Sequence, residues 1–341
     1  MKRPSRLMGT VDFLCFAVPN PIIAERLAEG FRGLKKNGGK MIVARCRLVL
    51  FAVFASLLTF ASGGVAAERQ RKLEDFDAKN FDHSTVIDNE WFPIKPGMKY
   101  IWDGYAIDEE GEEEPHSVAF IVTDLVKEIA GVQTRVGWDR DFVDGELEEA
   151  EIMFLAQDKE GNVWILGEYP EEYDNGKFDA APCWIHGING HAGIVVKGEQ
   201  EIGDNYSQGW APVVDYTDRA IVDQLGQKVT VPAGSFNDVL VIAESNQEVP
   251  GADHLKYYAP GVGVVYVGWR GEVTDQEEMK LIEFKELSPE ELAKARDAAL
   301  KLDKHGYEVS KDVYARTKPI DPLAPKAAED KRSQPPTSLG E

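Results

Sequence analysis

Three side chains that could bind a metal or act as a nucleophile lie within nine residues of one another. Cys183, His186 and His191 fall in the glycine-rich stretch 181–193, and a thiolate with two imidazoles can bind zinc or copper. The cysteine could also pair with a histidine for thiol catalysis. Structural zinc sites normally have four ligands, however, and a cysteine followed by tryptophan and isoleucine is typical of a small buried residue. Metal binding is therefore an alternative hypothesis, and no cofactor is predicted.

Carboxylates are concentrated in two stretches of the chain. Residues 108–114 contain six acids in seven positions, and residues 139–179 contain fourteen acids against three bases. Loop carboxylates of this kind could hold calcium, but no stretch has the spacing of a calcium-binding loop. Acids also keep the edges of an exported sheet soluble and discourage aggregation. We therefore expect a solvated acidic edge, with calcium binding as the alternative.

Recognisable catalytic motifs are missing from the sequence. It contains no G-x-S-x-G, H-E-x-x-H or G-x-x-x-x-G-K-[ST]. An enzyme is therefore less expected than a binding protein. A hydrolase or lyase that uses carboxylates with His186 or His191 stays an alternative, and it requires one of these histidines to meet an acid in a cleft.

Tryptophans offer a different kind of site. Seven are spread along the expected strands and loops, and most such residues fill a core. A curved sheet lined by aromatic rings could instead hold an apolar or sugar ligand. The residues predicted to contact such a ligand are Trp138, Trp164, Trp184 and Trp210.

The elements that must position these residues are mostly β-strands. Short alternating segments follow one another from about residue 81 to residue 287, separated by turn signals such as Asp144-Gly145 and Asn175-Gly176. No helical pattern interrupts them. The sequence thus predicts an all-β fold: a single domain of antiparallel, strongly curved sheet, either a half-barrel or a sandwich.

One helix is expected after the strands. Ser288 to Glu291 forms a capping box with proline at the first helical position. A narrow apolar stripe follows, and it should pack on the sheet. The β-domain with this helix is expected to span residues 81–303, preceded by a charged lead-in over 68–80. Residues 304–341 end proline-rich and without periodicity, which predicts a disordered tail.

An export signal is predicted near the start. Residues 48–61 are almost entirely apolar, two arginines precede them, and small residues up to Ala67 follow. This pattern indicates a signal peptide over residues 41–67, with residues 1–40 as an upstream extension. The predicted location is periplasmic or secreted. The alternative is a membrane anchor through residues 48–67, if they are not cleaved.

Charge narrows the choice of partners. The 341 residues carry a net charge of −21, and removal of residues 1–67 leaves 28 basic and 56 acidic residues, a net charge of −28. Such a surface repels nucleic acid and anionic membranes. After cleavage, no stable membrane insertion is expected, and Cys183 is the one remaining cysteine. The oligomeric state is left open.

Several segments resemble a set of uncharacterised exported bacterial β-proteins, some of which are similar to the TapB-like and LolA-like group. They are V-T-V-P-A-G-S-F from Val229, K-Y-Y-A-P-G-V-G from Lys256, and D-H-S-T-V-I-D-N-E-W-F-P-I-K-P-G from Asp82. The resemblance covers about residues 80–287, and it implies a half-barrel with a binding role. It transfers no catalytic residues, and this chain lacks the lipidation cysteine of several members. The leading hypothesis is an exported non-enzymatic protein that binds a small ligand or an envelope component in the concavity of its sheet.

Overall fold

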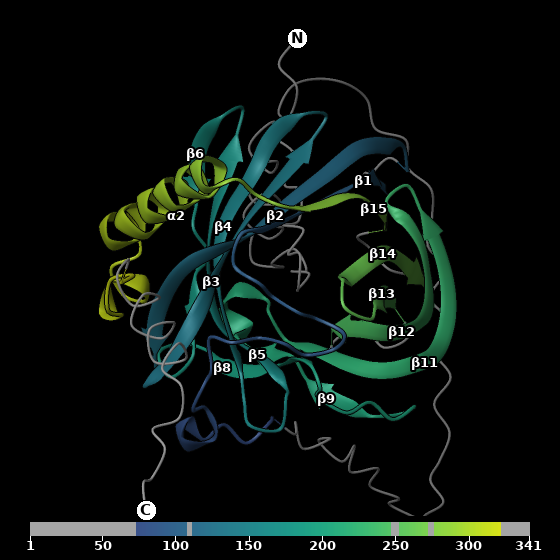
Figure 1. The fold of residues 1–341 in the computed structure, drawn as a ribbon. Coiled ribbons are helices and arrows are strands. Elements are labelled where there is room, and N and C mark those ends of the chain that lie inside the picture. Colours follow the sequence, from purple (N-terminus) through teal and green to yellow (C-terminus); the bar gives the residue numbers. More distant parts are fainter. Residues whose placement is uncertain (1–72, 108–110, 247–251, 272–275, 322–341) are drawn as a thin grey trace, which may run out of the picture. The chain divides into compact units, whose positions relative to one another are not determined.

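The structure is a computed structural model that describes residues 73–107, 111–246, 252–271 and 276–321. Fifteen strands form one antiparallel sheet, as predicted (Figure 1). They are β1 (Met98–Ile107), β2 (Glu113–Ile129), β3 (Val132–Val143), β4 (Glu146–Gln157), β5 (Val163–Asp174), β6 (Lys177–Ala180), β7 (Trp184–Ile185), β8 (His191–Val196), β9 (Asn205–Ser207), β10 (Gly209–Trp210), β11 (Asp218–Val231), β12 (Gly234–Asn246), β13 (Asp253–Ala259), β14 (Gly263–Arg270) and β15 (Glu277–Glu286).

The strand order explains the curvature of the sheet. It runs β10-β8-β5-β4-β3-β2-β1-β15-β14-β13-β12-β11-β9, with β6 and β7 attached to β5. The two ends of this order, β9 and β10, are consecutive in the chain, so the sheet must bend round to bring them together. The Tyr206 hydroxyl and the Gln208 amide both approach the carbonyl oxygen of Val195 on β8 at 3.4 Å. The result is a strongly curved half-barrel without a closing ladder.

The helix α2 (Pro289–Val309) defines the outer face of the sheet. Its N-terminus has the predicted capping box, in which Ser288 accepts from the amide of Glu291 and the Glu291 carboxylate accepts from the amide of Ser288. Of the predicted stripe, Ala295, Ala299 and Leu302 are buried. The helix packs against β2, β4 and β5 (Figure 1). We call the opposite side of these strands the inner face.

The helical region continues beyond the expected boundary. We expected the ordered domain to end at residue 303, whereas α2 runs to Val309 and a short 3₁₀ helix, η4, spans Tyr314–Arg316. The ring of Tyr314 is buried against that of Tyr169 on β5, 4.6 Å between centroids. Asp321 then bonds through its amide to the Val126 carbonyl at 3.0 Å. The expectation of a tail from residue 304 was wrong for residues 304–321, because Tyr314 anchors them. The predicted upstream extension and signal peptide, residues 1–67, lie outside the described residues.

A loop before β1 closes one end of the inner face. We call residues 84–96 the crossing segment; Ile87, Phe92 and Ile94 of this segment are in the hydrophobic core. The side-chain nitrogen of Asn89 donates to the carbonyl oxygens of Gly161 and Lys197. The side-chain oxygen of Asn89 accepts from the backbone amides of Trp91 and Phe92 in the same segment. The D-N-E-W-F-P motif is therefore structural: it ties the crossing segment across the strand ends.

Candidate functional site

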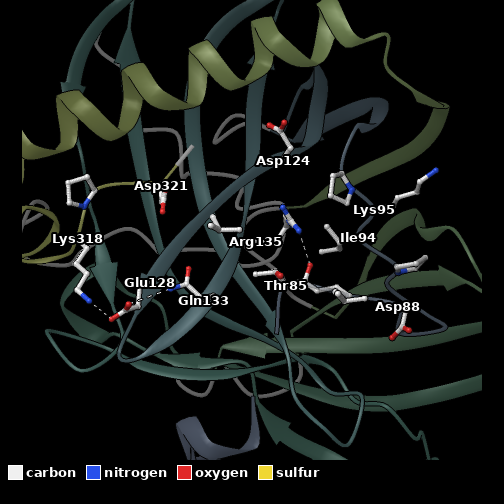
Figure 2. Close-up of a pocket in the computed structure, with 16 residues that line it drawn as sticks. Thr85, Asp88, Ile94, Lys95, Asp124, Glu128, Gln133, Arg135, Lys318 and Asp321 are labelled. Carbon is white, nitrogen blue, oxygen red and sulfur yellow. Dashed lines mark hydrogen bonds and ion pairs between the residues drawn. The ribbon is translucent and has the colours of Figure 1, made fainter. Parts of the chain in front are cut away.

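A pocket of about 750 Å³ lies between the crossing segment, the ends of β2 and β3, and residues 318–321 (Figure 2). We call it the rim pocket. Its apolar wall is built from Val86, Ile87 and Ile94 of the crossing segment and Val126 of β2, with several prolines. The same segment contributes to the core, since Ile87 and Ile94 are buried there as well as lining the pocket. The volume lies in the range of ordinary small-molecule sites, roughly 300–1,000 Å³.

Charged groups border the rim pocket, and most are bonded to one another or to the scaffold. Glu128 forms an ion pair with Lys318 at 2.7 Å, and Asp124 accepts from Arg296 of α2 at 2.9 Å. Arg135 is 7% exposed and donates to the backbone oxygen of Thr85 at 3.1 Å (Figure 2). Lys95 pairs with Glu286 at 3.1 Å. The pocket therefore offers an apolar wall with a polar border whose opposite charges largely cancel.

The inner face carries a second feature that the sequence did not predict. Register places polar residues on the inner side of neighbouring strands, and each carboxylate among them is at most 5% exposed. We call these residues the inner acidic layer: Asp139, Asp141, Glu149, Glu151, Glu168, Asp218, Glu244 and Glu277. The expectation of a solvated acidic edge was wrong for the five members that lie within residues 139–179, because the curvature of the sheet turns them inward.

Basic residues within this layer are few. His116 lies between Asp141 and Glu277, 2.6 Å and 3.4 Å away, and Lys256 pairs with Glu244 at 2.7 Å. Burial by itself lowers the pKa of His116, but the two carboxylates outweigh it and raise the pKa to about 10. For His254, burial outweighs the charges of Glu277 and Asp253, and its pKa is lowered to about 4. His116 is therefore the charged histidine of this layer at neutral pH.

Two carboxyl groups of the inner acidic layer have strongly raised pKa values. Burial, followed by the charge of Asp141, raises the pKa of Asp139 to about 7. Burial and the charge of Asp218 raise the pKa of Glu168 to about 8, although its bond from Trp184 opposes the change. Because burial is the largest cause of both shifts, these two carboxyl groups keep their protons to higher pH than an exposed carboxyl group does.

The predicted metal residues are not assembled into a ligand set. The thiol of Cys183 is buried at the outer face, and burial raises its pKa well above the ordinary value. The rings of His186 and His191 lie 5.1 Å apart, but their hydrogen bonds go to the backbone of Ala192. Within the described residues, no group of three or more His, Cys, Asp or Glu side chains could hold a metal ion.

The alternative hypothesis of a hydrolase or lyase requires His186 or His191 to meet an acid in a cleft, and the structure does not bring them to one. Burial lowers the pKa of His186 to about 4, and its ring packs on Phe76 at 4.2 Å. Neither His186 nor His191 has a hydrogen bond to a carboxylate of the described chain. The arrangement therefore lacks the acid that a hydrolase or lyase built on these histidines requires.

The four predicted tryptophans lie in different places. Trp138 is on the outer face under the guanidinium of Arg140, and Trp164 donates to Asp158 at 2.8 Å. Trp210 is half-buried on β10. Trp184 alone of the four reaches the inner acidic layer, where it donates to Glu168 at 2.7 Å and stacks on Tyr216. None of the four lines the rim pocket.

A different group of aromatic residues on the inner face encloses a small space. Tyr100, Trp102 and Phe120 line a void of only about 10 Å³ with Phe92 of the crossing segment. This void is too small for a ligand, so this part of the concavity is packed core. The residues of the rim pocket were not predicted as a site. Half of them belong to the stretch D-H-S-T-V-I-D-N-E-W-F-P-I-K-P-G from Asp82, which carried a resemblance but no signal of ligand binding.

The known proteins to which the chain is similar are too distant to support its fold or its function. No family model and no curated protein matches the chain. It is similar to a crystal structure of a "putative lipoprotein" from Parabacteroides distasonis ATCC 8503, with 14% identity, coverage of 57% of this chain and 98% of that one, and a TM-score of 0.26. It is also similar to a beta-barrel-like protein of domain of unknown function DUF1849 from Brucella abortus, with 10% identity, coverage of 56% and 98%, and a TM-score of 0.33. At these scores neither likeness bears on function.

Proposed function

We propose that this chain is a non-enzymatic binding protein that takes a small amphiphilic molecule into the rim pocket. The carrying observation is the cavity of about 750 Å³ between the crossing segment and the strand ends. An apolar body would lie on Val86, Ile94 and Val126, where its burial contributes roughly 25 cal/mol per Å². A polar group would face the charged border. The site thus differs from the aromatic-lined concavity expected from the sequence.

A pocket-filling substitution tests this proposal. Val86 lines the pocket and is only half-buried, so Val86→Trp should fill the space without disturbing the core. Val213 is 67% exposed and does not line the pocket, so Val213→Trp is the matched control. With 1-anilinonaphthalene-8-sulfonate as the fluorescent probe, we expect saturable binding that Val86→Trp weakens at least about tenfold and Val213→Trp leaves unchanged. Equal binding by all three proteins would contradict the proposal.

Native mass spectrometry can identify the natural ligand. Protein purified from its own host, with the two tryptophan variants beside it, should retain an extra mass in the unsubstituted chain and lose it in Val86→Trp. Retention of that mass by Val86→Trp would place the ligand elsewhere and reject the rim pocket.

Export is part of the proposal. It rests on the signal pattern of residues 41–67, which lie outside the described residues. No helix among the described residues is long and apolar enough to cross a membrane. We expect the mature protein to begin at Glu68, and N-terminal peptide mapping of protein from the host checks this. A chain that keeps residues 48–67 would contradict cleavage.

A further inference from the structure

One cation of the rim pocket differs from the other two in its burial. Arg135 on β3 is 7% exposed, whereas the side chains of Lys95 and Lys318 are 66% and 70% exposed. All three residues line the pocket. Water and salt screen an exposed ammonium group, but a buried guanidinium acts on its neighbours with much less screening. Arg135 is therefore the cation that a molecule in the pocket would feel most strongly.

Backbone hydrogen bonds hold the guanidinium of Arg135 between the two segments that build the apolar wall. It donates to the carbonyl oxygen of Leu125 at 3.5 Å and to that of Thr85 at 3.1 Å, the bond drawn in Figure 2. The residues that follow these two in the chain are Val126 and Val86, which belong to the wall. Register also pairs Arg135 with Val126, so these side chains lie on the same face of neighbouring strands. The cation is thus fixed beside the apolar surface itself.

The two bonds of Arg135 are compatible with a further hydrogen-bond acceptor. Both carbonyl oxygens are neutral, and a guanidinium group has several N–H donors in a planar fork. A carboxylate, sulfate or phosphate can accept from two of these donors at once and brings the opposite charge, whereas an alcohol does neither. A molecule with such a head group could bond Arg135 while its apolar part lies on Val86 and Val126.

The acids of the pocket border are less suited to receive a cationic head group. Three of them already accept from side chains of the scaffold: Asp124 from Arg296, Glu128 from Lys318, and Asp88 from Gln157. The fourth, Asp321, is exposed to water. Figure 2 shows Glu128 and Lys318 together on one side of the pocket, apart from the guanidinium of Arg135. A cation would compete for engaged or hydrated carboxylates, so these contacts favour an anion.

We propose that the rim pocket selects an anionic amphiphile, such as a medium-chain fatty acid or an alkyl sulfate, whose head group accepts hydrogen bonds from Arg135. The inference rests on the proposed function, because it names the polar group that the same pocket would take. The alkyl chain would lie on the wall that contains Val86 and Val126. Carboxylate, sulfate and phosphate head groups share the chemistry that is recognised, which is a negative charge with two acceptor oxygens.

Displacement of the neutral fluorescent probe N-phenyl-1-naphthylamine from the full chain tests the head group. The competitors are decanoate, decyl sulfate, decanol and decylamine, which differ chiefly in the group at the end of a straight alkyl chain. At about pH 7.5 the carboxylate is ionised and the amine is protonated, and about 0.15 M salt screens the remote charges of the acidic chain. We expect each anion to displace the probe at a concentration at least about tenfold lower than decanol or decylamine requires.

Replacement of the guanidinium assigns this preference to a residue. Arg135→Gln removes the charge and the planar fork, and we expect the preference for decanoate over decanol to fall to within about twofold. The matched control is Arg270→Gln, because Arg270 is exposed on β14 and does not line the pocket, and the preference should persist there. Circular dichroism and retained binding of the neutral probe show that Arg135→Gln is folded.

Contrary outcomes can be told apart. Equal displacement by decanoate and decanol, or a preference for decylamine, would overturn the inference on the unsubstituted chain alone, even if Arg135→Gln does not fold. A preference for decanoate that survives in folded Arg135→Gln would also overturn it. Displacement by decanoate but not by decyl sulfate supports it and identifies the head group as a carboxylate.

The variant Val86→Trp separates this inference from the proposed function. It should weaken binding of the neutral probe and of every competitor, because it fills the space that all of them need. If it leaves the probe bound as before, the rim pocket itself is rejected. If it weakens the probe and the unsubstituted chain shows no preference for anions, the pocket stands and only the choice of head group is wrong.

Discussion

Both faces of strands β2 to β5 bury charged groups, but the two faces satisfy these groups differently. On the outer face, the ammonium of Lys127 donates to Asp303 at 3.0 Å, to the Tyr307 hydroxyl at 3.1 Å and to the Lys318 carbonyl at 2.6 Å. Asp303 also accepts from the Tyr314 hydroxyl at 2.7 Å. On the inner face, Glu168 and Asp141 each keep a buried oxygen without a partner.

This difference separates a buried charge with several hydrogen-bond partners from buried carboxyl groups that keep one oxygen without a hydrogen bond. A buried ion pair is tolerated when its remaining hydrogen bonds are satisfied, as they are around Lys127. An incompletely satisfied buried acid costs free energy and persists where another requirement maintains it. The outer cluster therefore fastens α2 and the segment after it, whereas the inner acidic layer holds carboxyl groups whose ionisation is opposed chiefly by burial.

The largest effect should come from breaking the outer cluster. Asp303→Ala leaves the ammonium of Lys127 buried without its carboxylate, so we expect the free energy of unfolding to fall by about 3–5 kcal/mol. Urea denaturation measures this loss. Asp312→Ala is the control, because Asp312 is exposed beyond the end of α2. A loss below about 1 kcal/mol would show that the outer pair is no more structural than a surface pair.

The inner acidic layer should respond to substitution in the opposite sense. The pKa of Glu168, about 8, lies above its ordinary value of 4.5, so the folded state binds the proton more tightly than the unfolded state. Stability is then full below pH 4.5 and is lost as the pH rises to 8. Glu168→Gln removes this loss, and we expect it to stabilise the protein at pH 9 by roughly 2–4 kcal/mol in urea denaturation.

Asp139 and His116 act on stability in the same direction as Glu168, and two histidines act in the opposite direction. The pKa of Asp139, about 7, removes stability between pH 3.8 and 7, and the pKa of His116, about 10, removes it between 6.5 and 10. His186 and His254, both with pKa values lowered to about 4, remove stability as the pH falls from 6.5 to 4. The losses from the two acids and the gains from the two histidines cancel between about pH 4.5 and 6.5, and stability is expected to fall above pH 6.5. A melting temperature that rises steadily to pH 9, with Glu168→Gln below the unsubstituted chain, would contradict this assignment.

The sequence predicted the sheet and the helix because both depend on local pattern. Alternation and turn residues indicated the strands, and the Ser288 to Glu291 capping box fixed the start of α2. The inner acidic layer could not be read this way. In W-D-R-D-F on β3, alternation favours Trp138 and Phe142 inside, whereas the structure turns Asp139 and Asp141 inward and stacks Arg140 over Trp138 outside. Which face of a strand is enclosed depends on the closure of the whole sheet.

The rim pocket escaped prediction for a related reason. Its walls come from the crossing segment, from β2 and β3 and from residues 318–321, which meet only after the sheet has curved and α2 has docked. Residues 318–321 belong to the stretch expected to be disordered, and their order depends on Asp303 and Tyr314 rather than on their own composition. Sites formed by three distant segments leave little local signal in a single sequence.

The smallest effect should come from the other charged contact of α2. Arg296 donates to both oxygens of Asp124, which links the same helix to the same strand as Lys127 and Asp303 do, but these side chains are a quarter to a third exposed. Water already solvates an exposed pair and the two side chains lose mobility on pairing, so Arg296→Ala should cost at most about 1 kcal/mol in urea denaturation. Because Asp303→Ala and Arg296→Ala both remove an ion pair of α2, the ratio of their effects isolates burial as the cause. Equal losses would mean that the number of ion pairs on α2, and not the closed set of partners around Lys127, holds the helix on the sheet.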